Sequence, residues 1–326
     1  MNTSTSCDRL WRKRLNELSS VWPDFVGGRP TGLHKTRVAS RRIREALPIV
    51  SMCAPPAKVK KLNRKMRELT RYLGPIRELD VELGLLEDES KTENVPGRAI
   101  EILRREIVSK RQALRDDLAA NAPVGDVKKL IRKLERIGST EEKRKKEEGK
   151  GKKADGKQES EWRGVLATRL LRRAKTLRAA LSDAGPIYAP ERIHGVRIAT
   201  KKLRYALEIA RDAGVSGAAP LVRTLKRQQE RLGQLHDLQT LLKHVREAEA
   251  LPGVGLRVND LTLYADTLER ECRRLHAAFV EHRDELAACV KAVRQNLVPA
   301  LTTPPRRQAR AGVARPAVPA RVRAKS

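Results

Sequence analysis

Residues 33–49 read LHKTRVASRRIREALPI and residues 193–209 read IHGVRIATKKLRYALEI, so one pattern returns at an offset of 160 residues. A second block follows each copy in the same order, LGPIREL at 73–79 and LGQLHDL at 232–238. Two matched blocks in the same order indicate a tandem duplication of one helical unit. The identical positions of the first block are His34/His194, Arg37/Arg197, Ala39/Ala199, Arg44/Arg204, Ala46/Ala206, Leu47/Leu207 and Ile49/Ile209.

Both copies of the first block predict an amphipathic helix. At helical spacing, four basic or histidine side chains of each copy fall within a sector of roughly 80°. These are His34, Arg37, Arg41 and Arg44 in the first copy and His194, Arg197, Lys201 and Arg204 in the second. The opposite, apolar sector holds Ala39, Ile43, Ala46, Leu47 and Val50, and in the second copy Ala199, Leu203, Ala206, Leu207 and Ala210. One face should therefore pack on the core while the other presents cations.

The basic stripe indicates a site for an anion. Like charges one or two turns apart destabilise a helix by roughly a few tenths of a kcal/mol per pair. A charge run on a single helix is most often only a solvated face. Because both copies keep the stripe, we interpret it as a surface whose repulsion a bound anion offsets. Arg offers forked donors to phosphate oxygens, Lys a compact charge and His a donor nitrogen.

The helix after each copy extends this basic surface, although Glu230 interrupts the second of the two stripes. Two such units could face each other across a basic groove. The predicted polyanion-binding residues are His34, Arg37, Arg41, Arg42, Arg44, Lys60, Arg64, Arg67, Arg71, His194, Arg197, Lys201, Lys202, Arg204, Arg223, Lys226, Arg227 and Arg231.

Hydrophobic residues recur at helical spacing almost throughout, and no alternating run indicates a strand, so the sequence predicts an all-α fold. Helices are expected at about 8–22, 33–53, 57–88, 97–121, 124–138, 161–182, 190–212, 218–249 and 256–298, with kinks or short breaks at Gly74-Pro75 and Gly233. The expected organisation is a first helical half at 1–138, a disordered charged linker at 139–161, a second half at 162–302 and a disordered basic tail at 303–326.

Composition adds that the partner is anionic. The chain has 70 Lys+Arg against 40 Asp+Glu, a net charge of +30, and both helical halves are basic. Such an excess attracts nucleic acid, a membrane surface or a phosphate polymer. The four cysteines form no CxxC pair, which fits a reducing compartment. Neither a signal peptide nor a membrane-spanning run is visible, so we expect a cytoplasmic protein with no membrane association.

The sequence shows none of the residue patterns that usually indicate catalysis or metal binding. His34 and His194 each stand alone among cations, and a neighbouring Arg disfavours metal binding as well as the protonated imidazole. Glu78, Asp80 and Asp237 are expected to pair with nearby Arg rather than to act as acids. No carboxylate cluster for Mg²⁺ and no Gly-rich phosphate loop is visible, which disfavours a phosphotransferase or phosphohydrolase. We therefore expect no catalytic residue, no metal and no cofactor.

The blocks LHKTRVASRRIR and LGPIRELDV, then IHGVRIATKKLRYAL and LGQLHDL, resemble the paired signatures of the CHAD family, the conserved-histidine α-helical domain. The resemblance implies two four-helix bundles related by a pseudo-two-fold axis, with a basic groove or channel between them. It also implies binding of inorganic polyphosphate and association with polyphosphate granules. The family's basic and histidine positions fall on the repeated helix, including Arg42 and Lys202. Glu78 stands where the family usually has Asp, and Gln239 where it has its last acid.

A non-enzymatic polyphosphate binder is the function that we expect, with a helical nucleic-acid-binding protein as the alternative. Proteins that bind single strands use aromatic side chains as stacking platforms. The chain contains only 2 Phe, 4 Tyr and 3 Trp. Polyphosphate has no bases, so a surface of charges and donors is sufficient for it.

Overall fold

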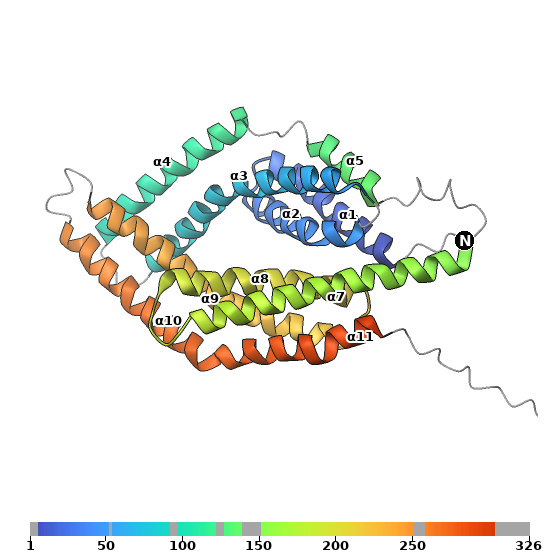
Figure 1. Cartoon of the computed structure of the whole chain (residues 1–326). Coiled ribbons are helices and arrows are strands. Elements are labelled where there is room, and N and C mark those ends of the chain that lie inside the picture. Colours follow the sequence, from blue (N-terminus) through green and yellow to red (C-terminus); the bar gives the residue numbers. More distant parts are fainter. Residues whose placement is uncertain are drawn as a thin grey trace, which may run out of the picture.

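The computed structural model describes residues 6–51, 54–91, 97–121, 127–138, 151–250 and 258–303, and every regular element in these ranges is a helix. The expected all-α class is confirmed (Figure 1). The first half contains α1 (Ser6–Val26), α2 (Pro30–Val50), α3 (Pro56–Glu89), α4 (Gly97–Asn121) and α5 (Val127–Gly138). The second half contains α7 (Gly151–Asp183), α8 (Pro190–Asp212), α9 (Ala218–Glu249) and α10 (Val258–Ala292), and α10 continues through the π-helical turn η3 (Val293–Leu297) into α11 (Val298–Thr302).

Prolines mark where several helices begin. Pro30, Pro56 and Pro190 are the first residues of α2, α3 and α8. The fixed φ of proline suits this position, and its missing N–H is not needed there. Of the expected kinks or short breaks at Gly74-Pro75 and Gly233, no break occurs, since α3 and α9 run through both positions without interruption. Figure 1 shows α3 changing direction along its length, as a proline inside a helix favours.

The start of α7 differs from the expected boundary. Residues 151–161, placed in the predicted linker, belong to this helix, whereas 139–150 and 304–326 lie outside the described residues. Trp162 is fully buried, and its indole donates a 2.7 Å hydrogen bond to Glu159, which also pairs with Arg163 at 3.1 Å. Extending an existing helix adds one hydrogen bond per residue without a new nucleation cost. A charged segment without an apolar face can therefore continue a helix that is anchored beyond it.

Packing brings the two halves together. In the second half, α7, α8, α9 and α10 contact one another in a closed order, which is the arrangement of a four-helix bundle. In the first half, α4 packs on α3 and also on α9 and α10, so this half is more open than the expected bundle (Figure 1). Across the halves, α2 contacts α8 and α7, and α3 contacts α9. The repeated helices α2 and α8 therefore lie side by side.

Candidate polyanion-binding site

The repeated helices bury the faces that the sequence assigns to the core. In α2 the apolar sector is buried at every position except Val50, which is half-buried, and in α8 all five apolar residues are buried. The buried positions are Ala39, Ile43, Ala46, Leu47, Ala199, Leu203, Ala206, Leu207 and Ala210. The amphipathic prediction is confirmed, and the basic sectors are left on the other side of each helix.

In the first half, His34 and Arg37 of the basic sector contact residues of the second sequence block, 73–79. Arg37 donates a 2.9 Å hydrogen bond to the carbonyl oxygen of Gly74 and a longer one, 3.4 Å, to Glu78. Arg77 donates from Nε to Nδ1 of His34 at 3.2 Å. Burial lowers the pKa of His34, and so do the neighbouring Arg77 and Arg37. The imidazole is thus an uncharged member of a cationic group.

The second half makes the equivalent contacts with the equivalent sequence block. Nδ1 of His194 lies 3.4 Å from Nδ1 of His236, and their ring centroids are 4.9 Å apart. Arg197 lies 3.8 Å from the carboxylate of Asp237. In both halves, the block contributes one residue against the histidine and one acid against the arginine. The expected pairing of the acids with arginine is confirmed here, and Asp80 likewise accepts a 2.6 Å hydrogen bond from Arg111.

The basic sectors of α2 and α8 converge. Lys201 of α8 is half-buried, and burial, then Arg197, Arg41 and Arg37, lower its pKa to about 6. The pKa of His236 is lowered to about 3, first by burial and second by the charge of Arg197. Residues from opposite halves are therefore near enough to disfavour each other's charge. We call this group the cationic cluster: His34, Arg37, Arg41, Arg77, His194, Arg197, Lys201 and His236, with the acids Glu78 and Asp237.

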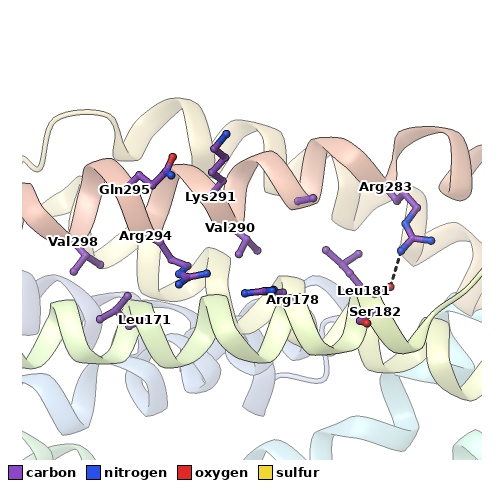
Figure 2. Close-up of a pocket in the computed structure, with 11 residues that line it drawn as sticks. Leu171, Arg178, Leu181, Ser182, Arg283, Val290, Lys291, Arg294, Gln295 and Val298 are labelled. Carbon is purple, nitrogen blue, oxygen red and sulfur yellow. Dashed lines mark hydrogen bonds between the residues drawn. The ribbon is translucent and has the colours of Figure 1, made fainter.

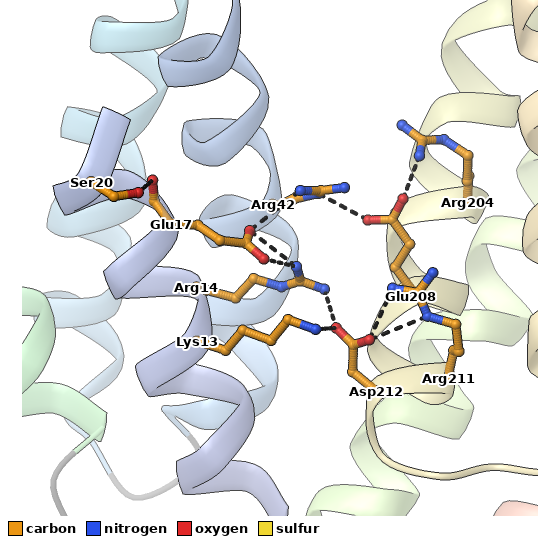
Figure 3. A network of polar contacts seen from close by, with 9 residues as sticks. All are labelled: Lys13, Arg14, Glu17, Ser20, Arg42, Arg204, Glu208, Arg211 and Asp212. Atoms are coloured by element: carbon orange, nitrogen blue, oxygen red, sulfur yellow. Dashed lines mark hydrogen bonds and ion pairs between the residues drawn. The ribbon is translucent and has the colours of Figure 1, made fainter. Parts of the chain in front are cut away.

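Arg42 and Arg204 have a different role from the rest of the predicted set. Arg42 donates to the buried carboxylate of Glu208 at 3.0 Å and to Glu17 at 3.3 Å. Arg204 also pairs with Glu208 and donates to Gln229 at 2.8 Å. Figure 3 shows Glu208 between the two guanidinium groups, one from each half of the chain. These two arginines connect α2 and α8 through a shared counter-charge, so their charge is already engaged.

A second basic group continues along the repeated helices. Burial, then Arg67 and Arg41, lower the pKa of Arg44, which places it beside the cationic cluster. Burial, then Arg173, lower the pKa of Lys202. Arg173 itself donates to Glu45 at 2.8 Å. We call this group the α7 extension: Arg44, Arg67, Arg172, Arg173 and Lys202.

The remaining predicted cations lie on α3 and α9. Lys60, Arg64 and Arg71 are exposed on α3. On α9, Arg223 is exposed, Lys226 pairs with Glu230 at 3.7 Å, and Arg227 pairs with Glu285 of α10 at 2.5 Å. Arg231 also lowers the pKa of Glu285, after the hydrogen bonds from Arg227 and Gln228. The α9 stripe therefore turns largely toward α10 and not toward the cationic cluster.

Four basic members of these groups, Arg77, His236, Arg172 and Arg173, were not among the predicted site residues. Arg77 and His236 occupy matching positions of the second sequence block, so the repeat itself carried a signal for them. Arg172 and Arg173 lie on α7, which no repeat links to the site. Among the described residues, no group of three or more His, Cys, Asp or Glu could hold a metal ion. Within the same part of the chain, no helix is long and apolar enough to cross a bilayer.

The fold and the cluster define an all-helical protein in which two repeated basic helices meet. The model of the CHAD domain family matches residues 9–246. The chain therefore belongs to the CHAD family. It is also similar to the crystal structure of the CHAD domain from the plant Ricinus communis, at 22% identity and a TM-score of 0.52, with 89% of this chain and 91% of that chain covered. At this identity the likeness concerns the fold. No curated protein matches the chain.

Proposed function

We propose that the chain binds inorganic polyphosphate at the cationic cluster without changing it chemically. The observation that carries the proposal is that Arg37 and Arg41 of α2 and Arg197 of α8 meet around the half-buried Lys201, closely enough to lower its pKa together with its burial. A linear chain of phosphates placed there replaces this mutual repulsion with charge-assisted hydrogen bonds. Within the α7 extension, Arg173 is engaged by Glu45, and the other members supply further positive charge for a polymer that continues beyond the cluster.

The proposal includes a shared groove between halves that are related by a pseudo-two-fold axis. It is supported by the matched contacts, in which Arg37 meets Glu78 at 3.4 Å and Arg197 meets Asp237 at 3.8 Å. Two similar sets of donors suit a ligand built from identical units. Recruitment of the protein to polyphosphate granules would follow from such binding.

Nucleic acid fits the cationic cluster less well because Tyr205, an aromatic residue near Arg197, offers bases no stacking platform. Tyr205 is close enough to Arg197 to influence its pKa, but the tyrosine side chain is buried. The guanidinium of Arg204 covers its ring at 4.6 Å from the centroid. A base stacked on an aromatic side chain, which contributes about 1–3 kcal/mol in single-strand binders, has no place on this ring.

Fluorescence anisotropy with labelled long-chain polyphosphate tests the proposal. We expect binding at moderate salt, with the logarithm of the association constant falling linearly as the logarithm of the salt concentration rises. Single-stranded DNA or RNA should displace the probe only at much higher concentrations. Absence of binding at moderate salt, or more effective displacement by nucleic acid, would contradict the proposal. Release of orthophosphate in the presence of Mg²⁺ would contradict its non-enzymatic part.

The affinity should increase as the pH falls from 8 toward about 6, the pKa of Lys201 in the free protein. Above that pH the free amine is mostly neutral, and a bound polyanion favours its charged form, so binding takes up a proton. Below that pH the amine is already charged, and this contribution levels off. Calorimetry in buffers with different ionisation enthalpies measures the proton uptake.

The variant Lys201→Arg tests the assignment of this proton. An arginine stays charged over the whole range, so proton uptake between pH 6 and 8 should decrease while binding persists. The pKa values of His34 and His194 are lowered as well, by burial first and then by neighbouring arginines, so some uptake at lower pH should remain. Unchanged uptake near pH 7 in the variant would assign the proton to another group.

A further inference from the structure

A pocket that shares no residue with the cationic cluster or the α7 extension lies between α7 and the continuous helix α10–η3–α11 (Figure 2). Its inner side is apolar. Leu181, Val290 and Val298 are buried there, while Leu171 is 40% exposed and forms the more open end. Leu171 and Leu181 are ten residues apart on α7, which corresponds to about 15 Å along the helix. The apolar surface is thus a narrow strip, recessed between two helices.

The polar side of the pocket is entirely cationic or neutral. Its charged lining residues are Arg178, Arg283, Lys291 and Arg294, and no Asp or Glu of the described residues lines it. Figure 2 shows Arg178 and Arg294 extending into the space between the helices from opposite sides. Arg283 is held at one end, where it donates a 2.9 Å hydrogen bond to the carbonyl oxygen of Leu181. Neither Arg178 nor Arg294 has a hydrogen-bond or ion-pair partner within the described part of the chain.

The local backbone is unusual at the same place. Arg294 belongs to the π-helical turn Val293–Leu297, which interrupts the otherwise α-helical run from α10 to α11. Single π-helical turns within α-helices are frequent at functional sites. Two converging guanidinium groups, an apolar strip and a π-helical turn thus coincide.

We propose that this pocket binds a single-chain anionic amphiphile, a medium-chain fatty acid in its carboxylate form. The carboxylate lies at Arg178 and Arg294, whose guanidinium groups can donate hydrogen bonds to it, and the acyl chain runs from there along the strip towards Leu171 and Val298. An inorganic phosphate would leave the apolar strip in water, which gives up the hydrophobic contribution. Because Leu181, Val290 and Val298 of the strip are buried, a free chain can reach more of it than the surface of a bilayer can. The proposal does not depend on the binding of polyphosphate.

Equilibrium dialysis of the full chain with radiolabelled dodecanoate, below its micellar concentration, tests the pocket. We expect saturable binding of one dodecanoate per chain, unaffected by excess polyphosphate. Acetate lacks the chain and dodecylammonium lacks the anionic head, so each should compete at least about tenfold more weakly than unlabelled dodecanoate. Equal competition by either compound would overturn the proposal, and so would binding that requires anionic vesicles.

Variants locate the site. Arg178→Gln combined with Arg294→Gln should weaken dodecanoate binding at least about tenfold, because two charge-assisted contacts are lost. Leu171→Glu, at an exposed position, should do the same by placing a negative charge beside the acyl chain. The matched control, Lys175→Gln with Arg270→Gln, removes two exposed charges from α7 and α10 outside the pocket and should bind normally. Normal binding by both pocket variants, or equal loss in the control, would overturn the assignment.

Discussion

Replacing Arg41 and Arg197 together by glutamine should weaken polyphosphate binding by about two to four orders of magnitude at low salt. Each charge-assisted hydrogen bond contributes about 1.5–3 kcal/mol, and the two residues bring one cation from each half to the same cluster. Neither removal leaves a tightly held buried acid behind, since Asp237 is 32% exposed and 3.8 Å from Arg197. Helix content measured by circular dichroism should therefore stay unchanged while the anisotropy titration shifts.

The matched control removes the same number of charges elsewhere. Arg104 on α4 and Arg132 on α5 are both exposed, and neither contributes to the pKa shifts of the cluster. Arg104→Gln with Arg132→Gln should cause only the small loss that follows from a lower net charge. A similar loss in both double variants would show that the total charge attracts the polymer and that the cluster has no special role.

Much of the cluster was predictable because helical periodicity fixes which side chains share a face. The buried sectors of α2 and α8 follow from residues three and four positions apart, and the pairing of Glu78 and Asp237 follows from matched sequence blocks. The convergence of Lys201 with Arg37 and Arg41 could not be read in the same way. It depends on how two helices 160 residues apart pack against each other, which periodicity does not specify.

The counter-charges of the basic sectors were missed for a related reason. Glu45 follows Arg41 by four residues and Glu208 follows Arg204 by four, so each basic sector ends in an acid on the same side of its helix. This spacing suggests only a local pair. In the structure, Glu45 binds Arg169 and Arg173 of α7, and Glu208 binds an arginine 166 residues earlier in the sequence. The cations that remain available for a ligand can therefore be chosen only after tertiary contacts are known.

The variant Glu208→Ala should lower the free energy of unfolding by about 3–5 kcal/mol, the usual cost of removing one partner of a buried ion pair. The Glu208 side chain is 2% exposed, and it neutralises Arg42 of α2 and Arg204 of α8 at the contact between the two halves. Without the carboxylate, Arg204, 11% exposed, has no counter-charge and keeps the hydrogen bond to Gln229 and the contact with the Tyr205 ring. Urea denaturation measures the change. The stability of Glu208→Gln should lie between those of the parent chain and Glu208→Ala, because the amide oxygen still accepts one hydrogen bond.

An exposed pair provides the comparison for this second variant. Glu101 and Arg105 of α4 are 72% and 79% exposed at a distance of 3.1 Å, so Glu101→Ala should change the stability by less than about 1 kcal/mol. Because Glu208→Ala removes the counter-charge of Arg204 and one of the two carboxylates paired with Arg42, the folded fraction should bind polyphosphate at least as tightly as the parent chain. Reduced stability together with undiminished affinity would separate the cations that hold the halves together from those that hold the ligand. Unchanged stability would mean that water replaces Glu208 at both guanidinium groups.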